Sequence, residues 1–86
     1  MKIKDGYILR QVAGEYVAIP SGNQLDLNRM ITLNATGAFL WEHLKEETTP
    51  EVLSEALQAE YDVDAETAAI AVSSFLDRLK DHELLD

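Results

Sequence analysis

The period of the apolar residues changes once along this chain, at Asn34, and that single change limits the folds that the chain can adopt. Before Asn34 the sequence is rich in β-branched and aromatic residues, interrupted at short intervals by glycine and proline. The three β-rich segments are residues 7–13, residues 15–19 and Met30–Leu33. Such segments, separated by turn-forming residues, are typical of short strands. We therefore expect a hairpin with Gly14 at or near its turn, followed by a third strand.

After Asn34, apolar residues recur every three or four positions, which is the period of an amphipathic helix. Three such stretches follow residues suited to cap a helix N-terminus, namely Asn34, Thr49 and Asp64. Pro50 stands at the first position of the second stretch, where its fixed φ angle favours a helix start. The predicted helices cover residues 35–44, 50–61 and 65–80.

Three strands followed by three helices define an α+β fold. We expect a three-stranded antiparallel sheet, and a helix-turn-helix formed by the last two helices across a three-residue turn. These parts predict a winged-helix-like domain in which the sheet comes first. A chain of 86 residues is too short for two independent cores, so residues 1–86 should form a single domain, with Leu84 and Leu85 folding back onto it.

The chain carries 16 acidic and 7 basic residues, which gives a net charge of −9. Nucleic acids and anionic membranes both attract clustered lysine and arginine, so neither is an expected partner. The helix that would enter a DNA groove begins with Asp64 and Glu66, whose carboxylates would repel phosphates. The excess acid favours solubility, or attraction for a basic peptide or protein.

Residues that carry chemistry are sparse in this sequence. There is no cysteine, which excludes disulfides and thiolate chemistry, and the glycines lack phosphate-loop spacing. His43 and His82 lie at predicted helix ends in polar surroundings, and Ser73 and Ser74 lack a nucleophile-elbow motif. We expect no enzyme activity, metal site or cofactor. Neither a signal peptide nor a membrane-spanning apolar run is recognisable, so we expect a soluble cytoplasmic protein.

The third strand, Met30–Leu33, raises a functional question. No later segment has strand character, so one edge of this strand lacks a predicted partner. Exposed apolar edges favour aggregation, and proteins usually protect them with charges, proline or a covering segment. These four residues include neither a charge nor a proline. Either a loop such as residues 24–29 or the C-terminal tail covers the edge, or the edge binds a partner.

Three stretches of the chain carry a family resemblance: YILRQVAGEYVAIP, LNRMITLNATGAFLWEHL and TPEVLSEALQAEYDVDAETAAIAVSSFLDRLKDHELL. In order and spacing they resemble the PqqD-like family over about nine-tenths of the chain. Members of that family, called RiPP recognition elements, are peptide chaperones. They bind the leader of a ribosomally made precursor peptide and present it to a modifying enzyme, often a radical SAM enzyme. The segments IPSGN and LKEET depart from the pattern of PqqD itself, which favours another peptide pathway over that of pyrroloquinoline quinone.

The resemblance implies that a leader lies as an added strand against the third strand, in a cleft whose other wall is the third helix. The strand side of this cleft would be Arg29, Met30, Ile31, Thr32 and Leu33. We place Val72 at the centre of the buried face of the third helix. At 100° per residue, the residues on one side of that face form a flank that could be the opposite wall. That flank consists of Ala69, Ile70, Ser73, Leu76, Asp77 and Lys80. Phase does not reveal which side faces the strand, so the other flank, with Ala71 and Arg78, stays open.

The leading hypothesis is therefore a non-catalytic leader-peptide binder whose partners are a precursor peptide and a modifying enzyme of the radical SAM type. An acidic winged-helix module for protein–protein contacts is the alternative, for example as a homodimer paired through the same strand edge. A DNA-binding regulator would need a basic recognition helix, which the sequence lacks.

Overall fold

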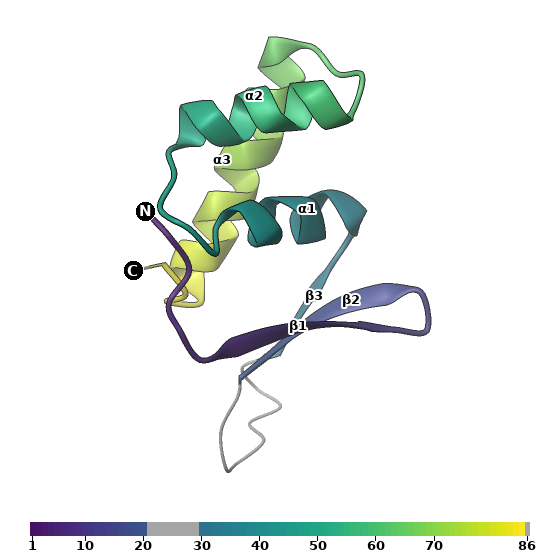
Figure 1. Cartoon of the computed structure of the whole chain (residues 1–86), viewed down its shortest axis with the longest axis vertical. Helices are drawn as coiled ribbons and strands as arrows, with labels where there is room; N and C mark the ends of the chain where they lie inside the picture. Colours follow the sequence, from purple (N-terminus) through teal and green to yellow (C-terminus); the bar gives the residue numbers. More distant parts are fainter. Residues whose placement is uncertain (21–29, 86) are drawn as a thin grey trace.

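The structure is a computed structural model that describes residues 1–20 and 30–85. The strands are β1 (Tyr7–Val12), β2 (Glu15–Pro20) and β3 (Ile31–Leu33), and the helices are α1 (Ala35–His43), α2 (Pro50–Glu60) and α3 (Ala65–Asp81). The strands form one antiparallel sheet in the order β1-β2-β3. Figure 1 shows α1 between the sheet and α2, with α3 crossing both helices in this view. The predicted α+β, winged-helix-like arrangement with the sheet first is confirmed.

The β1–β2 hairpin turns at Ala13 and Gly14, so the first strand ends one residue earlier than predicted. Val12 pairs with Glu15, and the two loop residues have positive φ angles of 52° and 83°. Two positive φ angles are typical of a tight turn that matches the right-handed twist of the strands. Gly14 adopts this conformation without steric cost, whereas the Cβ atom of Ala13 crowds the backbone.

Replacing Ala13 by asparagine should therefore raise the free energy of unfolding by about 1 kcal/mol, because asparagine tolerates the left-handed region better than alanine does. Urea unfolding of the two proteins measures this difference. Ala13→Val is the opposing control, since a β-branched side chain is strongly disfavoured at positive φ and should lower stability. Equal stability of all three proteins would contradict the hairpin geometry.

The centre of the core is α1, which lies against both β3 and α3. Leu40 and Trp41 of this helix are 1% exposed, and they belong to the same apolar cluster as Leu33 and Phe75. Gly37 leaves little room for a side chain, because a Cβ atom there would lie 3.3 Å from Phe75 and 3.4 Å from Leu33. The close approach at Gly37 sets the separation between the end of β3 and α3.

All three predicted helix caps are confirmed. The side chains of Asn34 and Asp64 each accept a backbone hydrogen bond of 2.7 Å, and that of Thr49 accepts one of 3.2 Å. Such bonds satisfy N–H groups that the first helical turn leaves without partners. Hydrogen bonds from the side chain and the backbone of Thr67 lower the pKa of the Asp64 carboxyl below its ordinary value.

The Asp64 cap should make stability depend on pH in the acid range. A carboxyl whose pKa is lowered by folding contributes stability above its unfolded pKa, about 3.9, and loses that contribution as the pH falls through the folded pKa. The melting temperature of the wild type should therefore fall relative to that of Asp64→Asn below about pH 4, since the amide caps the helix at every pH. Thermal melts followed by circular dichroism measure both proteins. A constant difference between them across the acid range would contradict the expectation.

The C-terminal residues fold back as predicted. Leu84 is buried, and its carbonyl accepts a hydrogen bond of 2.8 Å from the Lys4 N–H, while Leu85 forms an isolated β-bridge with Ile3. The described part of the tail therefore pairs with the N-terminal segment and does not cover the edge of β3. The alternative cover, residues 24–29, lies outside the described residues.

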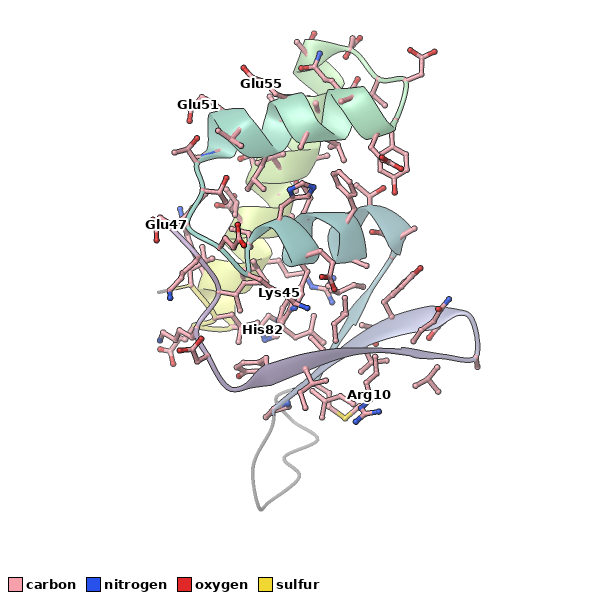
Figure 2. The ribbon with its side chains drawn as sticks, viewed as in Figure 1. Arg10, Lys45, Glu47, Glu51, Glu55 and His82 are labelled. Atoms are coloured by element: carbon pink, nitrogen blue, oxygen red, sulfur yellow. The ribbon has the colours of Figure 1, made fainter. Side chains whose placement is uncertain are left out.

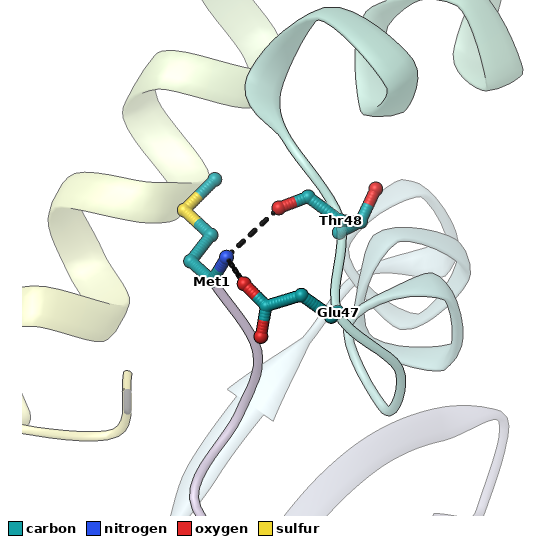
Figure 3. Close-up of polar contacts among 3 residues, drawn as sticks. All are labelled: Met1, Glu47 and Thr48. Atoms are coloured by element: carbon teal, nitrogen blue, oxygen red, sulfur yellow. Dashed lines mark hydrogen bonds and ion pairs between the residues drawn. The ribbon is translucent and has the colours of Figure 1, made fainter.

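The N-terminal residue is held against the connection between α1 and α2 (Figure 3). The Met1 ammonium contacts the Glu47 carboxylate and donates to the Thr48 carbonyl at 2.9 Å. The Thr48 N–H donates in return to the Met1 carbonyl at 2.9 Å. These bonds join the start of the chain to the connection between α1 and α2.

Candidate functional site

β3 forms one edge of the sheet and pairs with β2 on its other side. The paired residues are Leu33 with Tyr16, Thr32 with Val17 and Ile31 with Ala18. Ile31 and Leu33 are each 2% exposed, so their side chains lie in the core, whereas Thr32 is exposed. Met30 precedes the strand and is half-buried, which shortens the predicted strand by one residue.

Thr32 presents its main chain to the free edge of the sheet. In an antiparallel pair, successive residues alternate in direction, and the N–H and C=O of one residue point to the same side. The Thr32 carbonyl accepts a hydrogen bond from Arg78 of α3, so it does not face β2. The Thr32 N–H therefore faces the edge as well, while Ile31 and Leu33 direct their main-chain groups toward β2.

A cleft of about 270 Å³ lies between the end of β3 and α3. Its lining combines the end of β3, the N-cap and first turns of α1 and one flank of α3: Leu33, Asn34, Thr36, Gly37, Leu40, Ala71, Ser74, Phe75 and Arg78. The floor around Leu33 and Leu40 is apolar and buried, while Ser74 and Arg78 are exposed. An apolar floor with a few polar groups around it is typical of a site that accepts an apolar side chain.

The flank of α3 beside β3 is the one that the sequence left open. Most of the predicted flank lines a separate groove of about 460 Å³ between α2 and α3, namely Ala69, Ser73, Leu76, Asp77 and Lys80. Ile70 is 60% exposed and belongs to the lining of neither this groove nor the cleft. The structure therefore places the predicted flank toward α2, and does not bring it together with β3.

Of the predicted strand residues, Ile31, Thr32 and Leu33 form the edge strand, but they differ in what they offer a partner. Thr32 offers main-chain groups, and Leu33 contributes to the cleft floor. Either Ile31 or Leu33 is expected to contact apolar side chains of the peptide; the side chain of Ile31 is buried in the core and does not line the cleft, whereas Leu33 does. Arg29 lies outside the described residues.

Arg78 is the site residue whose contact was not foreseen. Its Nη2 atom donates to the Thr32 carbonyl at 2.7 Å, across 46 residues of sequence. From the sequence alone, Arg78 is a cation in the last turn of α3, where positive charge suits the helix dipole. The one sequence signal that placed Arg78 near the strand is its position on the flank with Ala71, which the sequence left open as an alternative wall of the cleft.

None of the other charged side chains that the structure describes is buried. Figure 2 shows Glu51 and Glu55 projecting from α2 on the side away from α1, and Arg10 projecting from the sheet face opposite the helices. Within residues 1–20 and 30–85, no group of three or more histidine, cysteine and carboxylate side chains is arranged to hold a metal ion. No helix in that part of the chain is long and apolar enough to cross a membrane. What the cleft offers is main-chain hydrogen-bonding groups and an apolar floor.

A strand edge beside an apolar cleft is the arrangement used by domains that add an extended peptide to their sheet. The family described as "Coenzyme PQQ synthesis protein D (PqqD)" matches residues 15–85, so the chain belongs to the PqqD family, as the resemblance predicted. A solved structure described as "TbiB1 in Complex with the TbiA(beta) Leader Peptide" is 32% identical in sequence, with a TM-score of 0.77. The similarity covers 100% of this chain and 95% of that chain. No curated protein matches.

Proposed function

We propose that this protein is a RiPP recognition element, which binds the leader of a ribosomally made precursor peptide and presents it to a modifying enzyme. The observation that carries the proposal is the main chain of Thr32, which faces the sheet edge beside the cleft. Membership of the PqqD family and similarity to a domain solved with a leader peptide support it.

In the proposed complex the leader adds to β3 as a fourth strand. The leader residue opposite Thr32 exchanges both main-chain hydrogen bonds with it and carries its side chain on the outer face of the sheet. The leader residues on either side turn their side chains to the face that carries Leu33, and therefore toward the cleft. Main-chain bonds supply affinity in this mode, and the cleft selects for apolar side chains.

The proposed contact surface combines residues 30–33 with the flank of α3 that contains Ala71, Ser74 and Arg78. Arg29, at the start of the predicted strand side, stays a prediction. The flank predicted from helical phase is replaced in this proposal, because all of its residues except Ile70 line the groove against α2.

The protein supplies no chemistry of its own in this proposal. The modifying enzyme carries out the reaction, and the family resemblance suggests an enzyme of the radical SAM type. The net charge of −9 favours association with a basic patch on that enzyme or with basic residues of the precursor.

Titration of ¹⁵N-labelled protein with synthetic leaders of candidate precursors, the TbiA(beta) leader among them, tests the proposed function. Amide shifts should gather at residues 30–33 and at Ala71, Ser74 and Arg78. Amides on the other flank, such as Ser73 and Lys80, should change little. Shifts confined to the α2–α3 groove, or no shifts with any candidate leader, would overturn the proposal.

Self-pairing through β3 is the second candidate, because the same edge could join two copies in a continuous sheet. This protein would then be an acidic interaction module that forms a homodimer. A net charge of −9 on each copy opposes that association. Sedimentation equilibrium separates the two functions, since a dimer that dissociates when leader is added supports leader binding, and a dimer that leader leaves intact supports the interaction module.

A further inference from the structure

Arg78 already occupies the part of the β3 edge that a leader would need. Its Nη2 atom donates to the Thr32 carbonyl at 2.7 Å, and both residues are exposed to solvent. A leader strand paired with Thr32 must donate its own N–H to the same carbonyl. Because the guanidinium lies where the main chain of the leader would run, the leader and Arg78 compete for this edge.

Arg78 also lacks a counter-ion among the described residues. The ion pairs in residues 1–20 and 30–85 join Met1 to Glu47 and Lys45 to Glu42, and none involves Arg78. This is notable in a chain with 16 acidic residues. A guanidinium has five N–H donors in a fixed fork that matches a carboxylate, so a neutral carbonyl is a weaker partner than an acidic side chain.

We propose that Arg78 is a displaceable cap on the β3 edge, and that it binds an acidic side chain of the leader once the leader has displaced it. This inference rests on the proposed function and adds the chemistry that the site selects, an aspartate or glutamate at the rim of the cleft. In the peptide-free protein, the cap covers an edge that would otherwise attract another strand. On binding, a contact with a neutral carbonyl is exchanged for a charge-assisted one, which offsets the cost of opening the edge.

The charge of the rest of the protein sharpens this selectivity. With a net charge of −9, the surface disfavours acidic side chains at most positions along a bound peptide. Arg78 reverses that preference at one place, beside the residue that pairs with Thr32. A leader with an acidic residue there is favoured, and one with the same residue elsewhere is not.

A double-mutant cycle tests the carboxylate contact. The probe is the leader that shifts the β3 amides in the titration described above, together with versions in which each acidic residue is changed in turn to its amide. Arg78→Gln should weaken binding of the unchanged leader about tenfold. The same variant should change binding of one amide version by less than about twofold, because the charge pair is already absent. Equal losses for every version would overturn the contact.

Lys80→Gln is the matched control for this cycle. It removes one positive charge from the same helical turn, but Lys80 lines the groove against α2. Binding of every leader version should be nearly unchanged by it. A loss equal to that of Arg78→Gln would show that net charge alone sets the affinity and would overturn the inference.

The peptide-free protein tests the cap separately. The ¹³C resonance of the Thr32 carbonyl should move in Arg78→Gln, which removes its donor, and stay in place in Lys80→Gln. An unmoved resonance in Arg78→Gln would overturn the cap. If no leader binds at all, the proposed function fails and the carboxylate contact fails with it, while this resonance still decides whether Arg78 caps the edge.

Discussion

A Thr32→Pro variant should remain folded and bind the leader about 10 to 100 times more weakly than the wild type. Proline has no N–H, and the N–H of Thr32 faces the sheet edge, so the substitution leaves the bonds between β3 and β2 intact. The carbonyl of the leader residue opposite would lose its donor, and the proline ring would occupy the space of the incoming strand. An unpaired acceptor at a buried strand pair costs about 1–3 kcal/mol, which corresponds to the expected loss.

Thr32→Val is the matched control, since it changes the exposed side chain but keeps the main-chain N–H. Isothermal titration calorimetry with the same leader should give the valine variant an affinity close to that of the wild type. Melting temperatures of both variants verify that each is folded. Wild-type affinity in a folded Thr32→Pro protein would rule out strand addition at this edge. An equal loss in both variants would show that the Thr32 side chain, and not its main-chain N–H, contributes the affinity.

The second large effect on leader affinity is expected when a side chain of the protein itself fills the cleft. Ser74 lies on the cleft lining and is exposed, so phenylalanine at this position places its ring over the apolar floor without disturbing the core. The leader side chain that should enter the cleft would then stay in water. Burying such a side chain is worth about 1.5–3 kcal/mol, so Ser74→Phe should weaken leader binding by about 10- to 100-fold.

The neighbouring serine provides the control for this variant. Ser73 is also exposed, but it lines the groove between α2 and α3, so Ser73→Phe adds the same ring on the opposite flank. Leader affinity, measured by fluorescence anisotropy with a labelled peptide, should be almost unaffected by Ser73→Phe. The reverse pattern, with loss in Ser73→Phe and none in Ser74→Phe, would show that the leader binds the flank predicted from helical phase, which faces α2.

The elements were predictable from the sequence because their signals are local. The caps at Asn34, Thr49 and Asp64 each act within three residues, so the residue type and the following periodicity were enough to find them. The turn at Gly14 was predicted correctly, but the end of the first strand was placed one residue too late, for a reason that is equally local. The two-residue loop has positive φ angles at both positions, and the sequence supplies one glycine, so Ala13 carries a conformation that its residue type does not indicate.

The site was predictable only in part, because its geometry depends on how the elements pack. The order of the elements already implied that β3 has a free edge. Helical phase correctly put Val72 in the buried face of α3, but phase measures an angle around one helix and does not identify the neighbour on each side. The bond between Arg78 and Thr32 spans 46 residues and needs the whole fold, so no spacing within the sequence could indicate it.

β3 is three residues long, and within it only Thr32 turns its main chain outward. In the proposed complex, the leader main chain is therefore hydrogen-bonded to β3 at one residue only, and the stretch beyond the cleft behaves as a tether. Each further residue extends the reach of that tether by about 3.3 Å. The number of residues between the leader residue paired with Thr32 and a target side chain would then decide which side chain reaches the enzyme. A biosynthetic pathway built on this domain could alter its product sequence freely, provided that the spacing is kept.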